Sequence, residues 1–182
     1  VTMVRDINKR SNNVMVRQVF LTLCAKRRQP GDKDDLAAAE REIRAWLASK
    51  GIDNRTMVFE NGAGLSRIER ITARQMALLL QDAWESRFAA EQIASLPLVA
   101  MDGTMRRRLG NADMAGMGHI KTGSLRNVRS IAGFTRDEDN TTWAVVAMVN
   151  NPRAWQTEPV LDAFIEQVHL STRPPSISTA SQ

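Results

Sequence analysis

The chain has 182 residues, of which 43% are hydrophobic, so it can form one domain with a substantial core but not comfortably two. Its 25 Lys and Arg residues outnumber 20 Asp and Glu residues, and aromatic residues make up only 5%. Because no aromatic platform accompanies the two short basic clusters, at 26–28 and 106–108, we interpret them as solvated faces and expect no nucleic-acid partner.

The few cysteines and histidines exclude two further classes of site. Cys24 is the single cysteine, so no internal disulfide can form, and its apolar helical surroundings predict a small buried side chain. His119 and His169 are far apart and have no Cys or acidic residue at ligand spacing, so no metal site is expected. No run of eighteen apolar residues and no signal-peptide pattern occurs, so neither a transmembrane segment nor a signal is expected within this chain.

Helices are predicted first, from apolar residues that recur every three or four positions. One helix follows "RSNN", the next spans "DLAAAEREIRAWLASKG", and a third spans "TARQMALLLQDAWES", where Thr72 and Gln75 fit a capping box. A shorter helix is predicted from Ala89 to Ser95. The three predicted apolar faces contain, in chain order, Val16, Val19, Phe20 and Leu23; Leu36, Ala39, Ile43, Trp46 and Leu47; and Met76, Leu79, Leu80, Ala83 and Trp84.

The last third of the chain has a different pattern. The runs "HIKTGSL", "VRSIAGFTR" and "TTWAVVAMVNN" are short, rich in β-branched and apolar residues, and separated by polar turn-formers. They predict three consecutive antiparallel strands, followed by a helix with Pro159 in its first turn. Residues 171–182 lack periodicity and are predicted to be a disordered tail. The fold class is therefore α+β, with residues 1–170 as one unit.

The first predicted strand opens with Lys121, Thr122 and Gly123. A lysine there supplies a positive potential for the anionic end of a substrate, and Thr122 can donate a hydrogen bond to the same anion. Gly123 removes a side chain where an extended peptide could lie along the strand edge. An ordinary strand start accounts for the triplet equally well, so the motif alone does not identify a site.

The segment Ser11-Asn12-Asn13 also has two interpretations. Ser and Asn are favoured helix N-caps, so capping of the next helix accounts for the triplet by itself. The alternative comes from the pairing of Ser-x-Asn with a later Lys-Thr-Gly, the order that penicilloyl serine transferases use.

With these two motifs the sequence resembles the low-molecular-mass class C penicillin-binding proteins, the D-alanyl-D-alanine carboxypeptidases/endopeptidases of peptidase family S13. The resemblance runs from "INKRSNNVMVRQVFLTL" through "ENGAGLSR" and "LPLVAMDGTMRRRL" to "HIKTGSLRNVRSIAGF". Glu60 and Ala63 depart from the family's Asp-Asn-Gly-Ser-Gly-Leu-Ser-Arg. The resemblance implies a serine β-lactamase/transpeptidase-like fold and a serine acyl-enzyme mechanism on peptidoglycan stem peptides, with β-lactam antibiotics as inhibitors and no cofactor.

The family's residue roles transfer to the matching positions. Ser11 would relay a proton toward the leaving amine, Asn13 would hydrogen-bond the substrate amide, and Lys121 would set the electrostatics. Thr122 and Ser124 would bind the terminal carboxylate, and the Ser124 backbone N–H would form half of an oxyanion hole.

One element of the family pattern is absent. The family's nucleophile lies in Ser-x-x-Lys, and no serine of this chain is followed three positions later by lysine. The chain is therefore interpreted as the C-terminal part of the enzyme, incomplete without an N-terminal part and inactive alone. An open sheet edge and an uncovered apolar face on "WAVVAMV" are expected, so the piece should remain associated with its N-terminal part.

Other functions remain open at the level of sequence. A non-catalytic peptidoglycan-binding derivative of the same fold would also lack Ser-x-x-Lys. A β-lactamase would differ by fast release of the penicilloyl group, and a basic module for an anionic surface has only the net charge in its favour. Because peptidoglycan lies outside the cytoplasmic membrane, the resemblance implies a periplasmic location.

Overall fold

The computed structural model describes residues 2–110 and 113–171 and confirms the predicted α+β order of helices, three strands and a final helix. The helices are α1 (Thr2–Arg10), α2 (Asn13–Arg27), α3 (Asp35–Ser49), α4 (Ala73–Glu85), α5 (Ala89–Ser95) and α6 (Glu158–His169), with short 3-10 helices η1 (Gly103–Met105) and η2 (Ala154–Gln156). The strands are β1 (Gly118–Leu125), β2 (Val128–Arg136) and β3 (Thr142–Asn150).

The three strands form one antiparallel sheet in the order β1-β2-β3, as the sequence predicts. Leu125 pairs with Val128 across a two-residue turn, and the β2–β3 ladder runs from Val128–Asn150 to Arg136–Thr142. β-branched and apolar residues dominate these runs because they pack well on a pleated, half-buried surface.

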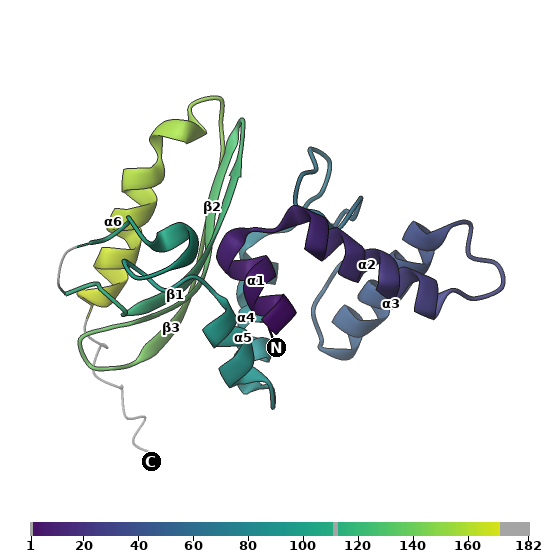
Figure 1. Ribbon diagram of the computed structural model, residues 1–182, viewed down its shortest axis with the longest axis horizontal. Helices are drawn as coiled ribbons and strands as arrows, with labels where there is room; N and C mark the ends of the chain where they lie inside the picture. The colour runs from purple at the N-terminus through teal and green to yellow at the C-terminus, as the bar shows by residue number, and fades with distance from the viewer. Residues whose placement is uncertain (1, 111–112, 172–182) are drawn as a thin grey trace, which may run out of the picture.

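Helices cover both faces of the sheet (Figure 1). α6 packs on one face against β2 and β3, and α4 packs on the other with α5 beside it, while α2 and α3 extend away from the sheet. The main core lies between the sheet and α6, where Ile120, Ile131 and Ile165 are fully buried. Their burial fixes the register of β1, because a one-residue slip would turn Ile120 to the opposite face.

The helix termini follow the predicted chemistry. The Thr72 side chain accepts from the Gln75 backbone and the Gln75 side chain accepts from the Thr72 backbone, so the capping box at the start of α4 is confirmed. The final helix has Pro159 in its first turn. Cys24 is buried and donates to the carbonyl of Phe20 at 2.9 Å, and burial raises the pKa of its thiol.

All three predicted faces are wrong in part, and one helix is not predicted at all. The apolar pattern places Trp46 and Trp84 on apolar faces, but they are 47% and 46% exposed, because both lie at the margin of their helix stripe. On the predicted face of α2, Val19 and Leu23 are 43% and 39% exposed, because α2 extends away from the sheet and packs mainly on α3. The sequence does not predict α1, because none of its residues is buried and the helix therefore needs no apolar stripe. Polar contacts hold it instead, and one of these is the hydrogen bond from Asn8 Nδ2 to Ser95 Oγ at 2.7 Å.

No helix within the described residues is long and apolar enough to cross a membrane. Of the predicted tail, residues 172–182 lie outside the described residues.

Candidate active site

Ser11 occupies the junction between α1 and α2. The N–H of Asn12 donates to the carbonyl of Ile7 at 3.0 Å, which closes the end of α1 and places Ser11 at the left-handed position of the turn, with φ of 51°. This conformation costs a non-glycine residue about 1 kcal/mol. The cap of α2 is Asn12, whose side chain accepts from the Met15 backbone, so the Ser11 and Asn13 side chains are available for other contacts.

Lys121 lies in the middle of β1 and not at its start as predicted, because the strand begins at Gly118, and its side chain reaches Ser11. Its Nζ donates to Ser11 Oγ at 2.7 Å and to the carbonyl of Thr122 at 2.8 Å. Burial lowers the pKa of Lys121 because the ammonium loses hydration. The structure therefore joins the two motifs, which are 110 residues apart in the chain, through a cation and a hydroxyl.

Asn13 contacts a different part of the molecule. Its Nδ2 donates to the carbonyl of Ala63, within the "ENGAGLSR" segment. That segment is closed by Glu69, whose Oε1 accepts the backbone N–H groups of residues 60–62 at 3.1–3.3 Å. Arg17 also holds it by donating to the carbonyl of Asn61. The loop thus orients the Asn13 carboxamide through its Nδ2.

A pocket of about 140 Å³ lies beside the second half of β1. Thr122, Gly123 and Ser124 line it, and Thr104 of η1 joins them by accepting a hydrogen bond from Thr122 Oγ1 at 2.8 Å. The three residues that the sequence assigns to substrate binding therefore share one cavity.

Two arginines and one glutamate set the charge of this pocket. Arg108 donates to Asp162 through Nε at 3.0 Å and Nη2 at 2.6 Å, and Arg129 donates to the carbonyls of Leu125 and Val128. Both arginines line the pocket together with Glu158. The charge of Arg108 is balanced by Asp162 and by Glu158, whose Oε1 lies 3.9 Å from Nε, whereas the Arg129 guanidinium donates to neutral carbonyls.

The backbone of β1 presents N–H groups to its outer edge. The N–H of Ile120 points away from β2 and donates to the carbonyl of Pro97 at 2.8 Å. Since N–H direction alternates along a strand, Ser124, four residues later, also directs its N–H away from β2. This donor lies beside the pocket that Ser124 lines.

Gly123 has a structural reason to lack a side chain. A Cβ at this position would lie 2.3 Å from Ser130 Oγ on the paired strand. The Gly-Ser pair therefore lets Ser130 reach the pocket, which it also lines.

His119 is a half-buried titratable group on β1, two residues before Lys121. Its Nδ1 is buried and has no hydrogen-bond partner among the described residues. Burial lowers the pKa of His119, and the charge of Lys9 lowers it further, while a hydrogen bond to the Leu96 backbone opposes the shift.

This lowered pKa predicts acid sensitivity. The unfolded chain takes up a proton on His119 below about pH 6.5, whereas the folded chain resists it until lower pH, so stability is complete above that value and falls as pH decreases. We expect the thermal midpoint to decrease from about pH 7 to 5, and to decrease less in His119→Gln. Parallel curves for the two proteins, measured by circular dichroism, would contradict the assignment.

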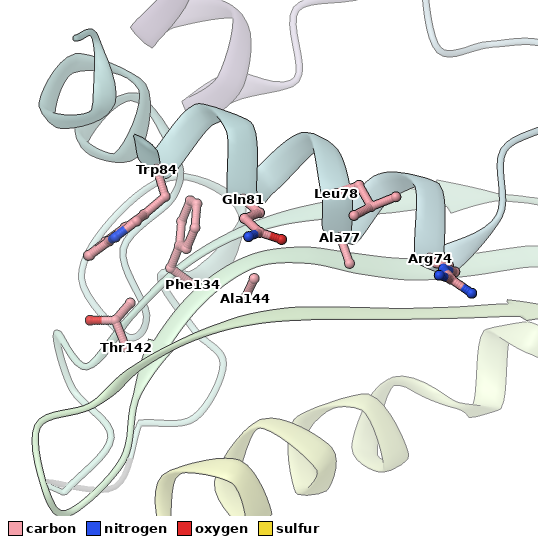
Figure 2. A pocket seen from close by; sticks show the side chains of 8 residues that line it. All are labelled: Arg74, Ala77, Leu78, Gln81, Trp84, Phe134, Thr142 and Ala144. Atoms are coloured by element: carbon pink, nitrogen blue, oxygen red, sulfur yellow. The ribbon is translucent and has the colours of Figure 1, made fainter. Parts of the chain in front are cut away.

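A larger cavity of about 320 Å³ lies between α4 and the sheet (Figure 2), and Lys121 is not among the residues that line it. Its wall is mostly apolar, and the rings of Trp84 and Phe134 lie side by side in it with centroids 5.5 Å apart. Thr142 and Ala144 contribute from β3, an edge strand of the described sheet. This cavity offers apolar contact and no pair of groups suited to acid–base chemistry.

Several contributors to the site carry no signal in the sequence. Thr104, Asp102 and Lys9 belong to segments that carry the family resemblance, but nothing in their local pattern indicates contact with the two motifs. Ala63 contributes only its carbonyl, which explains how the site tolerates alanine where the family has serine.

Comparison with known proteins identifies the family. The D-Ala-D-Ala carboxypeptidase 3 (S13) family matches residues 1–169. A D-alanyl-D-alanine carboxypeptidase from an Actinomadura species is 30% identical over 97 residues, which are 50% of this chain and 18% of that protein.

Two solved structures have the same fold. Penicillin binding protein 4 from Haemophilus influenzae, complexed with a β-lactam, matches with a TM-score of 0.75 at 19% identity. The match covers 90% of this chain and 41% of the Haemophilus chain. A penicillin G acylated predatory endopeptidase from Bdellovibrio bacteriovorus, in complex with an immunity protein, matches with a TM-score of 0.63 at 19% identity. The match covers 92% of this chain and 45% of the endopeptidase chain. The chain spans less than half the length of each of these proteins. Because the family match extends over 1–169, the chain belongs to the D-Ala-D-Ala carboxypeptidase 3 (S13) family.

Proposed function

We propose that this chain is the C-terminal part of a periplasmic serine D-alanyl-D-alanine carboxypeptidase/endopeptidase that acts on peptidoglycan stem peptides and is acylated by β-lactams. The observation that carries this proposal is the hydrogen bond from Lys121 Nζ to Ser11 Oγ at 2.7 Å, next to a pocket lined by Thr122, Gly123 and Ser124. A cation that holds a hydroxyl beside this pocket suits proton relay to a leaving amine.

Each residue then has a defined role. Ser11 passes a proton toward the leaving nitrogen, and Lys121 stabilises the negative charge that develops during attack. Asn13 accepts the substrate amide N–H through Oδ1. Thr122 and Ser124 bind the terminal carboxylate, and the outward N–H of Ser124 supplies half of the oxyanion hole.

The nucleophile, in this proposal, comes from an N-terminal part that carries Ser-x-x-Lys. The exposed edge of β3 and the apolar cavity beside Trp84 provide the surface on which that part would pack. The polypeptide that contains residues 1–182 together with this part is the longer form of the protein.

Intact mass spectrometry with a labelled penicillin tests the proposal. The longer form should take up one penicilloyl group, and residues 1–182 alone should take up none, because they lack the nucleophile. A longer form without Ser-x-x-Lys, or one that stays unlabelled, would instead favour the non-catalytic peptidoglycan-binding derivative.

The Ser11 hydroxyl is tested by two variants of the longer form. We expect Ser11→Ala to slow acylation by about 10²-fold, because it removes the proton relay. Ser11→Gly should be equally slow but more stable than Ser11→Ala by about 1 kcal/mol, since glycine adopts positive φ without strain. Acylation rates and urea unfolding measure the two effects, and equal stabilities would contradict the strained backbone at Ser11.

A further inference from the structure

An ion pair fastens α1 to the loop before β1. Lys9 Nζ contacts both carboxylate oxygens of Asp102, at 2.8 and 2.6 Å, although the two residues are 93 positions apart. The Lys9 side chain is 12% exposed and that of Asp102 is 37% exposed, so the pair is half-buried and solvent screens it less than a fully exposed pair. Asp102 Oδ1 also accepts the N–H of Leu98 at 2.7 Å, which fixes the carboxylate within its own loop.

Each residue of this ion pair lies two positions before a hydroxyl residue of the site. Lys9 lies two residues before Ser11, and Asp102 lies two residues before Thr104, the hydroxyl that binds Thr122. The backbone at Gly103 also lies close to the backbone at Lys9, because a Cβ on Gly103 would lie 2.7 Å from the carbonyl oxygen of Lys9. One ion pair thus joins the segment that carries the relay hydroxyl to the segment that carries a wall of the pocket.

We propose that Lys9 and Asp102 are positioning residues that hold the Ser11 hydroxyl on Lys121. Neither lines the pocket, so they act through the placement of α1. The inference depends on the proposed function only where acylation is measured. The conformation of Ser11 explains why such a pair is needed, because a residue with φ of 51° at the end of a helix without buried side chains requires an external contact to hold it.

The test compares variants of opposite charge in the longer form. Lys9→Met removes a positive charge and Asp102→Asn removes a negative charge, so any direct effect of these charges on the pKa of Lys121 would have opposite signs in the two variants. Loss of positioning instead frees Lys121 to hydrate, so we expect its pKa to rise in both variants. NMR titration of lysine labelled with ¹³C at Cε measures this pKa directly.

The same two variants should slow acylation by a labelled penicillin about 10–100-fold, as expected when a reacting group is displaced by an ångström or less. Because they break one shared contact, the double variant should be no slower than the slower single variant. Lys50→Met and Asp82→Asn are matched controls, since these residues form a 2.7 Å ion pair between the end of α3 and α4, outside the site. The controls should leave both readouts unchanged.

The outcomes separate the two proposals. If the wild-type longer form is not acylated but the Lys121 pKa rises in both variants, the proposed function fails and the positioning role stands. Opposite pKa shifts in Lys9→Met and Asp102→Asn, or unchanged pKa and acylation in folded variants, would overturn the positioning role.

Discussion

Replacement of Lys121 by Met in the longer form should reduce the rate of penicillin acylation by about 10²–10⁴-fold, the range that a positioned acid–base group contributes. Met has a similar length but cannot donate to Ser11 Oγ or carry charge. Stopped-flow or gel measurement of labelled penicillin uptake gives the rate.

Thermal unfolding of the same variant separates chemistry from folding. Because burial lowers the pKa of Lys121, the buried charge costs stability, and Met should leave the thermal midpoint unchanged or raise it. Lys50→Met serves as the control, since this lysine lies outside the site and should retain full acylation. A Lys121→Met protein that is acylated at the wild-type rate would remove Lys121 from the mechanism.

The second large effect concerns stability. Gly133 on β2 pairs with Ile120, and a Cβ at Gly133 would lie 2.0 Å from the carbonyl oxygen of His119 and 2.9 Å from the Cα of Ile120. Both are backbone atoms, so only separation of β1 from β2 relieves the overlap. We expect Gly133→Ala to destabilise the fold by about 3 kcal/mol, which in a protein of this size lowers the thermal midpoint by roughly 6–12 °C.

Gly123→Ala is the matched comparison for stability, because Gly123 lies on the same ladder. Its Cβ would approach the Ser130 side chain, with Oγ at 2.3 Å, and a serine hydroxyl can rotate away. This variant should lose less than about 1 kcal/mol, and addition of Ser130→Ala should recover part of the loss. Equal destabilisation of Gly133→Ala and Gly123→Ala would show that the backbone contact at His119 carries no special cost.

The sheet was predictable because its signals are local. Each strand is a short run of β-branched and apolar residues bounded by turn-formers, and the two-residue gap after Leu125 fixes the first hairpin. Helices with an apolar stripe were predictable for the same reason. α1 was not, because its stability comes from contacts such as Lys9 with Asp102, and no local pattern indicates a contact between residues 93 positions apart.

The candidate site was predictable only where a motif marked it. Ser-x-Asn and Lys-Thr-Gly mark Ser11 and Lys121, and the structure brings these two residues within hydrogen-bond distance. The motifs give no information about the pocket wall formed by Thr104 or about the carbonyl of Ala63 that orients Asn13. Those contributions depend on how distant loops pack, which the local sequence does not encode.

The cap at Asn12 has a consequence for how this segment can change during evolution. Asn12 starts α2 while its two neighbours face Lys121 and the loop at Ala63. Insertion or deletion of one residue here would rotate the helix start by about 100° and would remove the cap and both contacts together. A substitution at one of these positions removes one contact, whereas a change in length removes all three, so the one-residue gap in Ser-x-Asn should be strongly constrained in length.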